Sequence, residues 1–437
     1  MGESARSRTR WPFWGTAGLL LLGAGIWALV EDVPVANVVW YLPAWYGYLF
    51  LLDAAIFARR GRSFLSHRRP ELVTMLFWSL PFWFFFEACN LVLENWYYVF
   101  GLRSRWASAG MSALAFATVL PACLFHADLL EAFGVWRGKT SRPLRFGRGA
   151  RRAVGLGGLV CVAAPLLAPR IAFPLIWFAP LGLDAANARM GAPSIIADLE
   201  RGHCGRLLRL LAGGLLAGIV WETINSSARC KWIYTVPGFE GSKIYEMPAA
   251  GFLGFPLLAT GAFAFFSFVR VFSAARGPWR PAAAVLALAF CAAIETMVER
   301  QTVRSRRPLL TELPALDAEA AQRLHAAGIP TPERLSRAAR KKGIAALSVE
   351  TALPAGTLAR AASEADLAIH KGMGAPRAAL LEAAGVHNLA DLAGQDPEVL
   401  SRRLALLAIG RGQDPPRPGE VRVWLNAARA SYGRPVR

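Results

Sequence analysis

Charged side chains are scarce in this sequence, and negative charge is the scarcer kind. Only 18% of the 437 residues are Asp, Glu, Lys or Arg, against about 25% in ordinary soluble domains, whereas 54% are hydrophobic. The 30 acidic residues are outnumbered by 49 basic residues, which gives a formal net charge of +19. This composition excludes a disordered chain and argues against a purely soluble enzyme. It is typical of a membrane protein whose cytoplasmic loops are rich in arginine.

Several signatures of enzymes and metal sites are also missing. The six cysteines are scattered, mostly within apolar runs, and none belongs to a C-x-x-C pair. We therefore expect buried thiols, and neither a disulfide framework nor a zinc site. The sequence contains no nucleotide-binding loop, no H-E-x-x-H motif and no G-x-S-x-G motif. It consequently predicts no metal and no cofactor, and it leaves open whether the protein is an enzyme.

Long apolar runs occupy most of the first 300 residues. The first extends from Trp11 to Val30 after three arginines, and it lacks the A-x-A pattern of a signal-peptide cleavage site, so we interpret it as a membrane span. Further runs that approach the length needed to cross about 30 Å of hydrocarbon lie at 38–58, 72–93, 108–133, 153–169, 171–188, 207–225, 248–270 and 281–298. We predict an all-α polytopic membrane bundle of eight or nine spans. The last run is the weakest, because it is rich in alanine and contains Glu295.

The distribution of arginine predicts the orientation of these spans. Nineteen basic residues fall in the loops assigned to the inside and six in the segments assigned to the outside, and the inside loops are 59–69, 137–152, 189–209 and 270–280. This asymmetry predicts a multi-pass protein of the bacterial inner membrane with a cytoplasmic N-terminus. Nine spans would leave the C-terminal tail outside, whereas the arginines between 300 and 307 favour the inside. Both positions of the tail stay open.

Two windows of the apolar region resemble each other. LLDAAIFARRGRSFL and FEACNLVLENWYYV in the first correspond to GLDAANARMGAPSII and WETINSSARCKWIYTV in the second. The paired residues, at offsets of 131 to 136, are Asp53 with Asp184, Ser63 with Ser194, Glu87 with Glu222, Asn90 with Asn225, Trp96 with Trp232, and Tyr98 with Tyr234. We predict two parallel repeats, at about 38–133 and 171–270, within a transmembrane domain of residues 1–300. We expect the two aspartates to pair with the neighbouring loop arginines.

The repeated glutamates are the candidate catalytic residues. Glu87 and Asn90 are three residues apart and share one face of a helix, as do Glu222 and Asn225. A carboxyl group at membrane depth usually faces the bundle interior and marks a functional path. Two such groups near each other would suit a general acid, a proton relay or a cation site. The alternative is a Glu–Asn hydrogen bond that clamps helices together.

Aromatic residues follow each repeated glutamate at the outer membrane boundary. Trp96, Tyr98, Trp232 and Tyr234 are interpreted either as an aromatic belt or as a wall that contacts a ligand. Glu246 follows the second set, beside a proline at the start of a helix, and is a further candidate for ligand binding.

The aromatic and acidic pattern resembles lycopene-cyclase-type membrane proteins. The residues that carry the resemblance are Trp221–Glu222, Trp232, Tyr234 and Glu246–Met247–Pro248, within 45–100 and 177–257. The family carries a duplicated multi-helix unit and cyclises isoprenoid ends by protonation, and the resemblance implies that chemistry here. The chain departs from the family after the proline, where it has Ala249 and Ala250 instead of paired acids.

The composition changes after Arg307 to one rich in alanine, glutamate and arginine. We predict a linker at 301–314 and a small soluble helical domain at 315–437. RLHAAGIPTPERL and LLEAAGVHNLADL repeat a helix, a glycine C-cap, a turn and a new helix, with Gly328 and Gly385 57 residues apart.

This tail resembles a bacterial helix-hairpin-helix domain that carries a domain-of-unknown-function label. The resemblance covers about 315–430 and implies that Lys371, Gly372 and Gly374 contact phosphate or a partner. A protein partner is favoured over DNA, since the tail has only a modest excess of positive charge.

The sequence supports three candidate functions. The first is binding or transforming a hydrophobic, isoprenoid-like lipid in the bilayer, at the repeated Glu, Asn, Trp and Tyr positions. The second is proton-coupled transport through the same carboxyl groups. The third is a non-catalytic membrane anchor whose helix-hairpin-helix tail recruits protein or DNA.

Overall fold

The computed structural model describes residues 11–31, 33, 39–236, 239, 243–274 and 279–432. The three N-terminal arginines and Arg276 lie outside these residues. Within the described part of the chain, nine helical segments are long and apolar enough to cross a membrane. They are Phe13–Val30, Tyr41–Arg60, Arg69–Leu93, Arg105–Ala132, Arg148–Leu167, Pro169–Met190, Gly205–Ser227, Ala249–Ser273 and Trp279–Gln301. The predicted all-α bundle with many apolar helices is confirmed, and the segment with Glu295 is among the nine.

The chain divides into two compact units. The helix bundle comprises Met1–Glu94, Trp106–Ala228 and Ala249–Gln301. The composite domain comprises Asn95–Arg105, Arg229–Pro248 and Thr302–Arg437. This division differs from the predicted one because two loops of the apolar region join the tail. Residues 302–314, predicted as a linker, also belong to the composite domain, since Leu310 and Leu313 are buried in its core.

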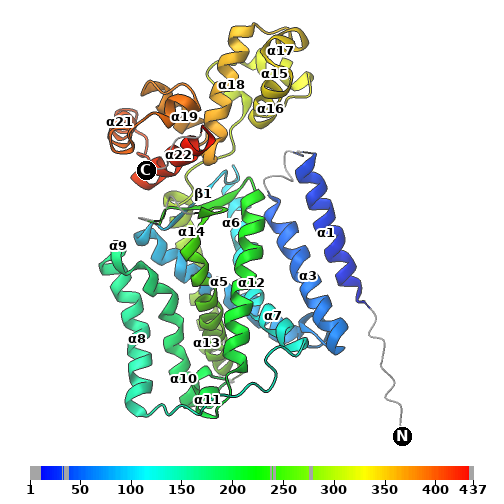
Figure 1. Cartoon of the computed structure of the whole chain (residues 1–437), viewed down its shortest axis with the longest axis vertical. Helices are drawn as coiled ribbons and strands as arrows, with labels where there is room; N and C mark the ends of the chain where they lie inside the picture. Colours follow the sequence, from blue (N-terminus) through cyan, green and yellow to red (C-terminus); the bar gives the residue numbers. More distant parts are fainter. Residues whose placement is uncertain are drawn as a thin grey trace. The chain divides into compact units, whose positions relative to one another are not determined.

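Figure 1 shows the helices of the bundle. Their bounds are α1 Phe13–Val30, α3 Tyr41–Arg60, α4 Phe64–His67, α5 Arg69–Leu93, α6 Arg105–Phe116, α7 Val119–Ala132, α8 Arg148–Leu167, α9 Pro169–Ala172, η1 Phe173–Leu181, α10 Gly182–Met190, α11 Ile195–Glu200, α12 Gly205–Ser227, η2 Ala249–Leu253, α13 Gly254–Ala274 and α14 Trp279–Gln301. Helices α5, α7, α12 and α13 pack together, with α14 against α5 and α1 against α3.

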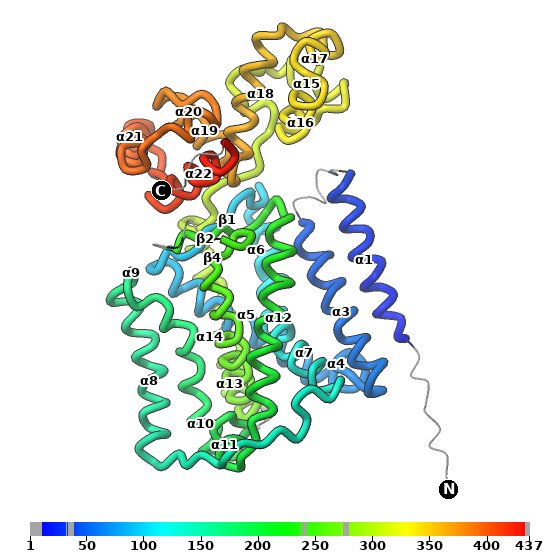
Figure 2. Tube along the Cα trace, in the orientation of Figure 1, coloured from blue at the N-terminus to red at the C-terminus, as the bar shows by residue number. Residues whose placement is uncertain are grey.

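Glycine pairs bring helices close together at two crossings. A Cβ added at Gly18 of α1 would lie 2.7 Å from the carbonyl oxygen of Gly47 in α3. A Cβ added at Gly158 of α8 would lie 2.7 Å from the Cα of Gly182, at the start of α10. Small residues at such crossings let two helix backbones approach closely in lipid. Figure 2 shows that α1 lies along α3, and α8 along α10, in the same manner.

The composite domain is built from short strands and short helices. Strands β1 (Trp96–Val99) and β2 (Lys231–Tyr234) pair antiparallel, and β3 (Lys243–Ile244) pairs with β4 (Met247–Pro248). The helices are η3 Leu310–Glu312, α15 Ala318–Ala326, α16 Pro332–Lys342, α17 Ile344–Thr351, α18 Ala355–Ile369, η4 His370–Gly372, α19 Ala375–Ala383, α20 Leu389–Ala393, α21 Pro397–Gly410 and α22 Pro418–Ser431. One apolar cluster runs through them, from Leu310 to Ala428.

The first strand connects all three segments of the composite domain. The Tyr98 amide donates to the carbonyl of Thr302 at 2.9 Å, and the Arg304 amide donates to the Tyr98 carbonyl at 2.8 Å. Tyr97, Val99 and Ile233 then form a small apolar cluster with Val423 of α22. The sheet is therefore packed directly against the last helix of the tail.

The two glycine turns expected in the tail are present. Gly328 and Gly385 have φ values of +77° and +78°, which favour glycine. After them, the amides of Ile329 and Val386 each donate to a carbonyl five residues back, at 2.9 Å. The side chains of Ile329 and Val386 are both buried. The two matching turns therefore anchor two helix pairs in one core.

The first glycine crossing gives a test of the bundle. We expect Gly18→Leu to lower the free energy of unfolding by about 1–3 kcal/mol, because the new side chain must separate α1 from α3. Thermal unfolding of the purified protein in detergent measures the change. Gly23→Leu on the same helix is the matched control, since a Cβ added at Gly23 would meet no other side chain or helix within 4 Å. Equal melting temperatures for the two variants would contradict this packing.

Candidate functional site

The repeated aspartates each hold the start of a short helix. Asp53 is fully buried and accepts hydrogen bonds from the Ser63 hydroxyl at 2.6 Å and the Phe64 amide at 3.0 Å. Asp184 accepts from the Ser194 hydroxyl at 2.9 Å and the Ile195 amide at 3.0 Å. The expected pairing of both aspartates with loop arginines is wrong. Each carboxylate instead satisfies the unpaired amides at the N-terminus of α4 or α11, which a helix start leaves open.

Glu87 and Asn90 lie side by side on the buried face of α5. Glu87 is 0% exposed and Asn90 1%. The indole nitrogen of Trp83, one turn earlier, donates to the Glu87 carboxyl at 2.9 Å. A second carboxyl group, that of Glu295 in α14, lies near both Glu87 and the Ser112 side chain. The first site therefore combines a buried acid, an amide and a neighbouring acid.

Glu222 and Asn225 occupy the corresponding positions in α12, and both are 0% exposed. The Tyr41 side chain of α3 lies within electrostatic range of Glu222. Trp221, the residue before the glutamate, packs against Trp45 with ring centroids 5.4 Å apart. The second site thus lies against the helix that begins the first repeat.

The two sites meet through indole rings. Trp83, which donates to Glu87, lies 5.5 Å from Trp221, measured between ring centroids. Trp45 completes the cluster and donates its own indole hydrogen to Thr118 at 2.9 Å. Sequence reasoning recognised Trp221 but missed Trp45 and Trp83. Trp83 could have been found, because it stands four residues before Glu87 and so shares its helix face.

The repeated aromatic residues after the glutamates form the sheet of the composite domain. Trp96 is opposite Tyr234, and Tyr98 is opposite Trp232. The Trp232 indole and the Tyr234 hydroxyl are also hydrogen-bonded, at 3.0 Å. Directly opposed aromatic pairs stabilise an antiparallel sheet. In the structure these four aromatic residues join the segments that follow the two repeated glutamates. Their role in binding a ligand stays a prediction.

Glu246 forms a buried ion triad with two lysines. The Lys231 ammonium lies 2.7 Å from its carboxylate, and the Lys371 ammonium lies 3.0 Å away. Burial acts to raise the pKa of Glu246, but the two ammonium groups outweigh it and lower this pKa to about 2. The triad joins β2, the segment before β4, and the turn that follows α18.

The predicted phosphate loop contacts residues of the same domain. Lys371 and Gly372 have φ values of +46° and +68° and form the expected tight turn. A Cβ added at Gly372 would lie 2.3 Å from the Cβ of Val99 in β1, and one added at Gly374 would lie 2.9 Å from the Cβ of Ser305. The Ser305 hydroxyl donates to the Gly372 carbonyl. The Lys371 ammonium group, predicted to contact a phosphate, donates hydrogen bonds to the carboxylate of Glu246.

The depressed pKa of Glu246 predicts a pH-dependent stability of the composite domain. A folded-state pKa of about 2, below the ordinary value of 4.5, stabilises the folded state above pH 4.5. This stabilisation, about 3 kcal/mol, is lost as the pH falls from 4.5 towards 2. We expect Glu246→Gln to be less stable at neutral pH and to approach the wild type near pH 2, as measured by tryptophan fluorescence during thermal unfolding.

Glu312→Gln is the control for this experiment. Glu312 pairs with Arg103 at 2.8 Å, but both side chains are at least one third exposed, so the pair contributes little. A Glu246→Gln variant that follows the wild-type curve at every pH would contradict the role assigned to the triad.

The family comparison with known proteins matches the tail of the chain. Residues 314–431 match the model of a family described as a domain of unknown function, DUF4332. This confirms a C-terminal domain of unknown function where one was predicted. No curated protein matches the chain, and no solved structure does.

Proposed function

We propose that the helix bundle binds a hydrophobic, isoprenoid-like lipid beside Glu87 and Glu222. The observation that carries this proposal is that both carboxyl groups are fully buried in long apolar helices and share one cluster of indole rings. Burying a carboxyl group inside a membrane bundle costs free energy. Such a group is therefore usually kept only where it serves a function. Indole faces suit an unsaturated hydrocarbon chain, and they stabilise a cation that forms on it when an acid donates a proton.

Internal duplication supports the same proposal. The matching Asp53 and Asp184 contacts, and the matching glycine crossings of α1 with α3 and α8 with α10, favour two parallel repeats. Each repeat then contributes one Glu–Asn pair to the aromatic cluster. Two equivalent acids in unlike surroundings are free to differ in protonation, so that one acts as the acid and the other as its counter-base.

Proton-coupled transport is the second candidate function. The observation that favours it is Glu295 of α14, whose carboxyl group lies near that of Glu87. Neighbouring carboxyl groups inside a membrane bundle are typical of proton relays in transporters. A transporter would require access to Glu87 and Glu222 from both sides of the membrane, whereas a lipid-binding site requires access from the bilayer.

Photolabelling tests the lipid proposal. With the protein in nanodiscs, a diazirine-bearing geranylgeraniol should label α5 and α12 of the wild type. We expect Glu87→Gln and Glu222→Gln each to reduce the labelling about tenfold, because each removes an acid that orients the ligand. Glu200→Gln is the control, since Glu200 pairs with Arg151 away from the indole cluster. Labelling that is unchanged in both glutamate variants would refute the proposal.

We also propose that the composite domain lies on the non-cytoplasmic face of the membrane. It contains the segments that follow α5, α12 and α14, which supports a common side for these three helix ends. The short loops at the opposite ends of the helices carry the 19 basic residues, and such loops face the cytoplasm. On this proposal the tail is a helix-hairpin-helix-like module that clamps its own membrane loops. A protein outside the cytoplasm, and not chromosomal DNA, would be its partner.

Reporter fusions at Arg437 test this orientation. Alkaline phosphatase folds only outside the cytoplasm and should be active there, whereas green fluorescent protein exported by the same route should stay dark. Fusions at Ser141, in a loop assigned to the inside, should give the opposite pair of results. A fluorescent, phosphatase-inactive C-terminal fusion would overturn the proposed side.

A further inference from the structure

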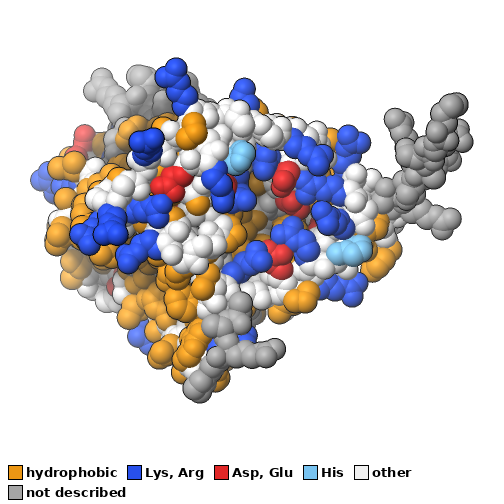
Figure 3. Space-filling model, turned by 90° about the horizontal axis from the view of Figure 1, so that it is seen from below, with side chains coloured by type: hydrophobic (Ala, Val, Ile, Leu, Met, Phe, Trp, Pro, Cys, Tyr) orange, Lys and Arg blue, Asp and Glu red, His pale blue; other side chains and the backbone are white. Residues whose placement is uncertain are grey.

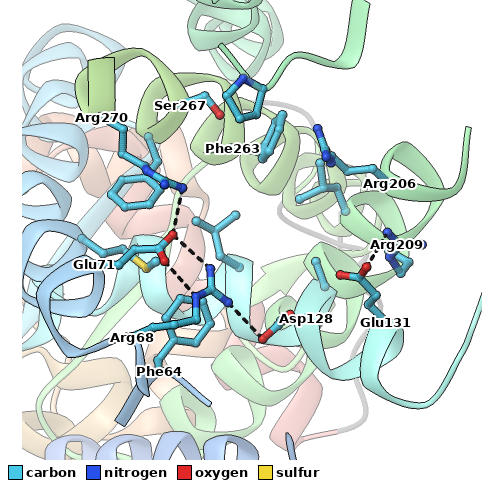
Figure 4. A pocket seen from close by; sticks show the side chains of 16 residues that line it. Phe64, Arg68, Glu71, Asp128, Glu131, Arg206, Arg209, Phe263, Ser267 and Arg270 are labelled. Carbon is cyan, nitrogen blue, oxygen red and sulfur yellow. Dashed lines mark hydrogen bonds and ion pairs between the residues drawn. The ribbon is translucent and has the colours of Figure 1, made fainter. Parts of the chain in front are cut away.

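A small pocket lined by both charged and apolar side chains lies at the end of the helix bundle where α5 and α12 begin. Its volume is about 220 Å³. It lies between α4, α5, α7, α12 and α13 (Figure 4). This size is below the range of about 300 to 1,000 Å³ for drug-sized ligands, so it suits a compact polar group.

Four arginines line this pocket. Figure 4 shows Arg68 and Arg270 on one side of the opening and Arg206 and Arg209 on the other. Two guanidinium groups lie over aromatic rings, Arg68 at 3.8 Å from the Phe64 centroid and Arg206 at 5.0 Å from that of Phe263. Stacking of this kind holds the planar group in place, and its fork of donors matches the oxygens of a phosphate.

The carboxylates around the pocket do not neutralise these arginines. Glu71 is shared between Arg68 and Arg270, and Asp128 between Arg68 and Arg60. Glu131 lies 3.6 Å from Arg209 and 3.7 Å from Arg60. Asp198 is shared between Arg201 and Arg206. Among the residues that line the pocket, four arginines meet three carboxylates, so the lining carries an excess of one positive charge that an anion would offset.

Apolar side chains also line the pocket. Met75 and Leu210 are no more than 1% exposed, and Arg209 beside them is only 12% exposed at its side chain. Charge interactions in such surroundings are screened less by water than those on an open surface. Figure 3 shows this end of the bundle, where Lys and Arg side chains gather around fewer Asp and Glu side chains.

We infer that this pocket binds a phosphate group, carried either by a lipid or by a small soluble anion. An adjacent feature favours the lipid. Phe265, Phe268 and Phe272, on the other face of α13, line an apolar groove of about 1120 Å³ with α5 and α14. The Glu71–Arg270 ion pair joins α5 to α13 between the pocket and the groove. An anionic lipid could thus place its phosphate among the arginines and its chain in the groove. This site does not depend on Glu87 or Glu222.

Two probes distinguish the two sources of phosphate. The full-length protein is titrated with pyrophosphate in detergent, and it is reconstituted in phosphatidylcholine nanodiscs with or without phosphatidic acid. A rise in melting temperature with phosphatidic acid identifies a lipid headgroup site, and a rise with pyrophosphate identifies a soluble anion. Either result supports the pocket when Arg209→Gln and Arg270→Gln each weaken binding about tenfold.

Arg201→Gln is the matched control, because Arg201 pairs with Asp198 but does not line the pocket. Arg209→Lys is the second variant in case Arg209→Gln fails to elute as a single species. It keeps the charge but loses the fork of donors, and it should weaken binding to a smaller extent. The inference is overturned if neither probe raises the melting temperature, or if Arg201→Gln weakens binding as much as the two pocket variants.

Discussion

A carboxylate removed from water must find hydrogen-bond donors or cations inside the protein, and this constraint organises the whole chain. Asp53 and Asp184 satisfy it with the first amides of a following helix. Glu87 finds the indole hydrogen of Trp83 within the bundle. Glu246 finds two ammonium groups and so joins three separate parts of the composite domain. An unpaired carboxylate in these places would cost several kcal/mol, so each contact also fixes the elements that supply the donors.

The same constraint separates the two ends of the bundle by their chemistry. Near the C-terminal ends of α5 and α12, the buried acids accompany a cluster of indole rings. At the end where α5 and α12 begin, arginines are more numerous than acids and share them in a network. An excess of arginine over acid in this network suits the proposed binding of an anion. The acids at the other end are those proposed to exchange a proton with an apolar ligand.

Local patterns predicted the helices and the turns, but not the contacts between distant segments. Apolar runs identified the membrane-length helices, and Gly328 and Gly385 identified the turns of the tail. The pairing of Trp96 with Tyr234 could not be predicted, because it joins residues 138 positions apart and depends on how the helices between them pack. Likewise, Lys371 was recognised as part of a tight turn. Its partner Glu246 lies 125 residues away, and no local rule connects the two.

The sheet of the composite domain has a consequence for biogenesis. Its strands are synthesised at residues 96–99 and 231–234, and the segment that completes it begins at Thr302. At about 5–20 residues per second, roughly 10–40 s separate the first strand from the last. During that interval the first strand has an open edge, and such edges invite wrong pairing. The composite domain can therefore fold only after α14 has been synthesised. A complete sheet thus indicates that all the membrane-length helices have already been made.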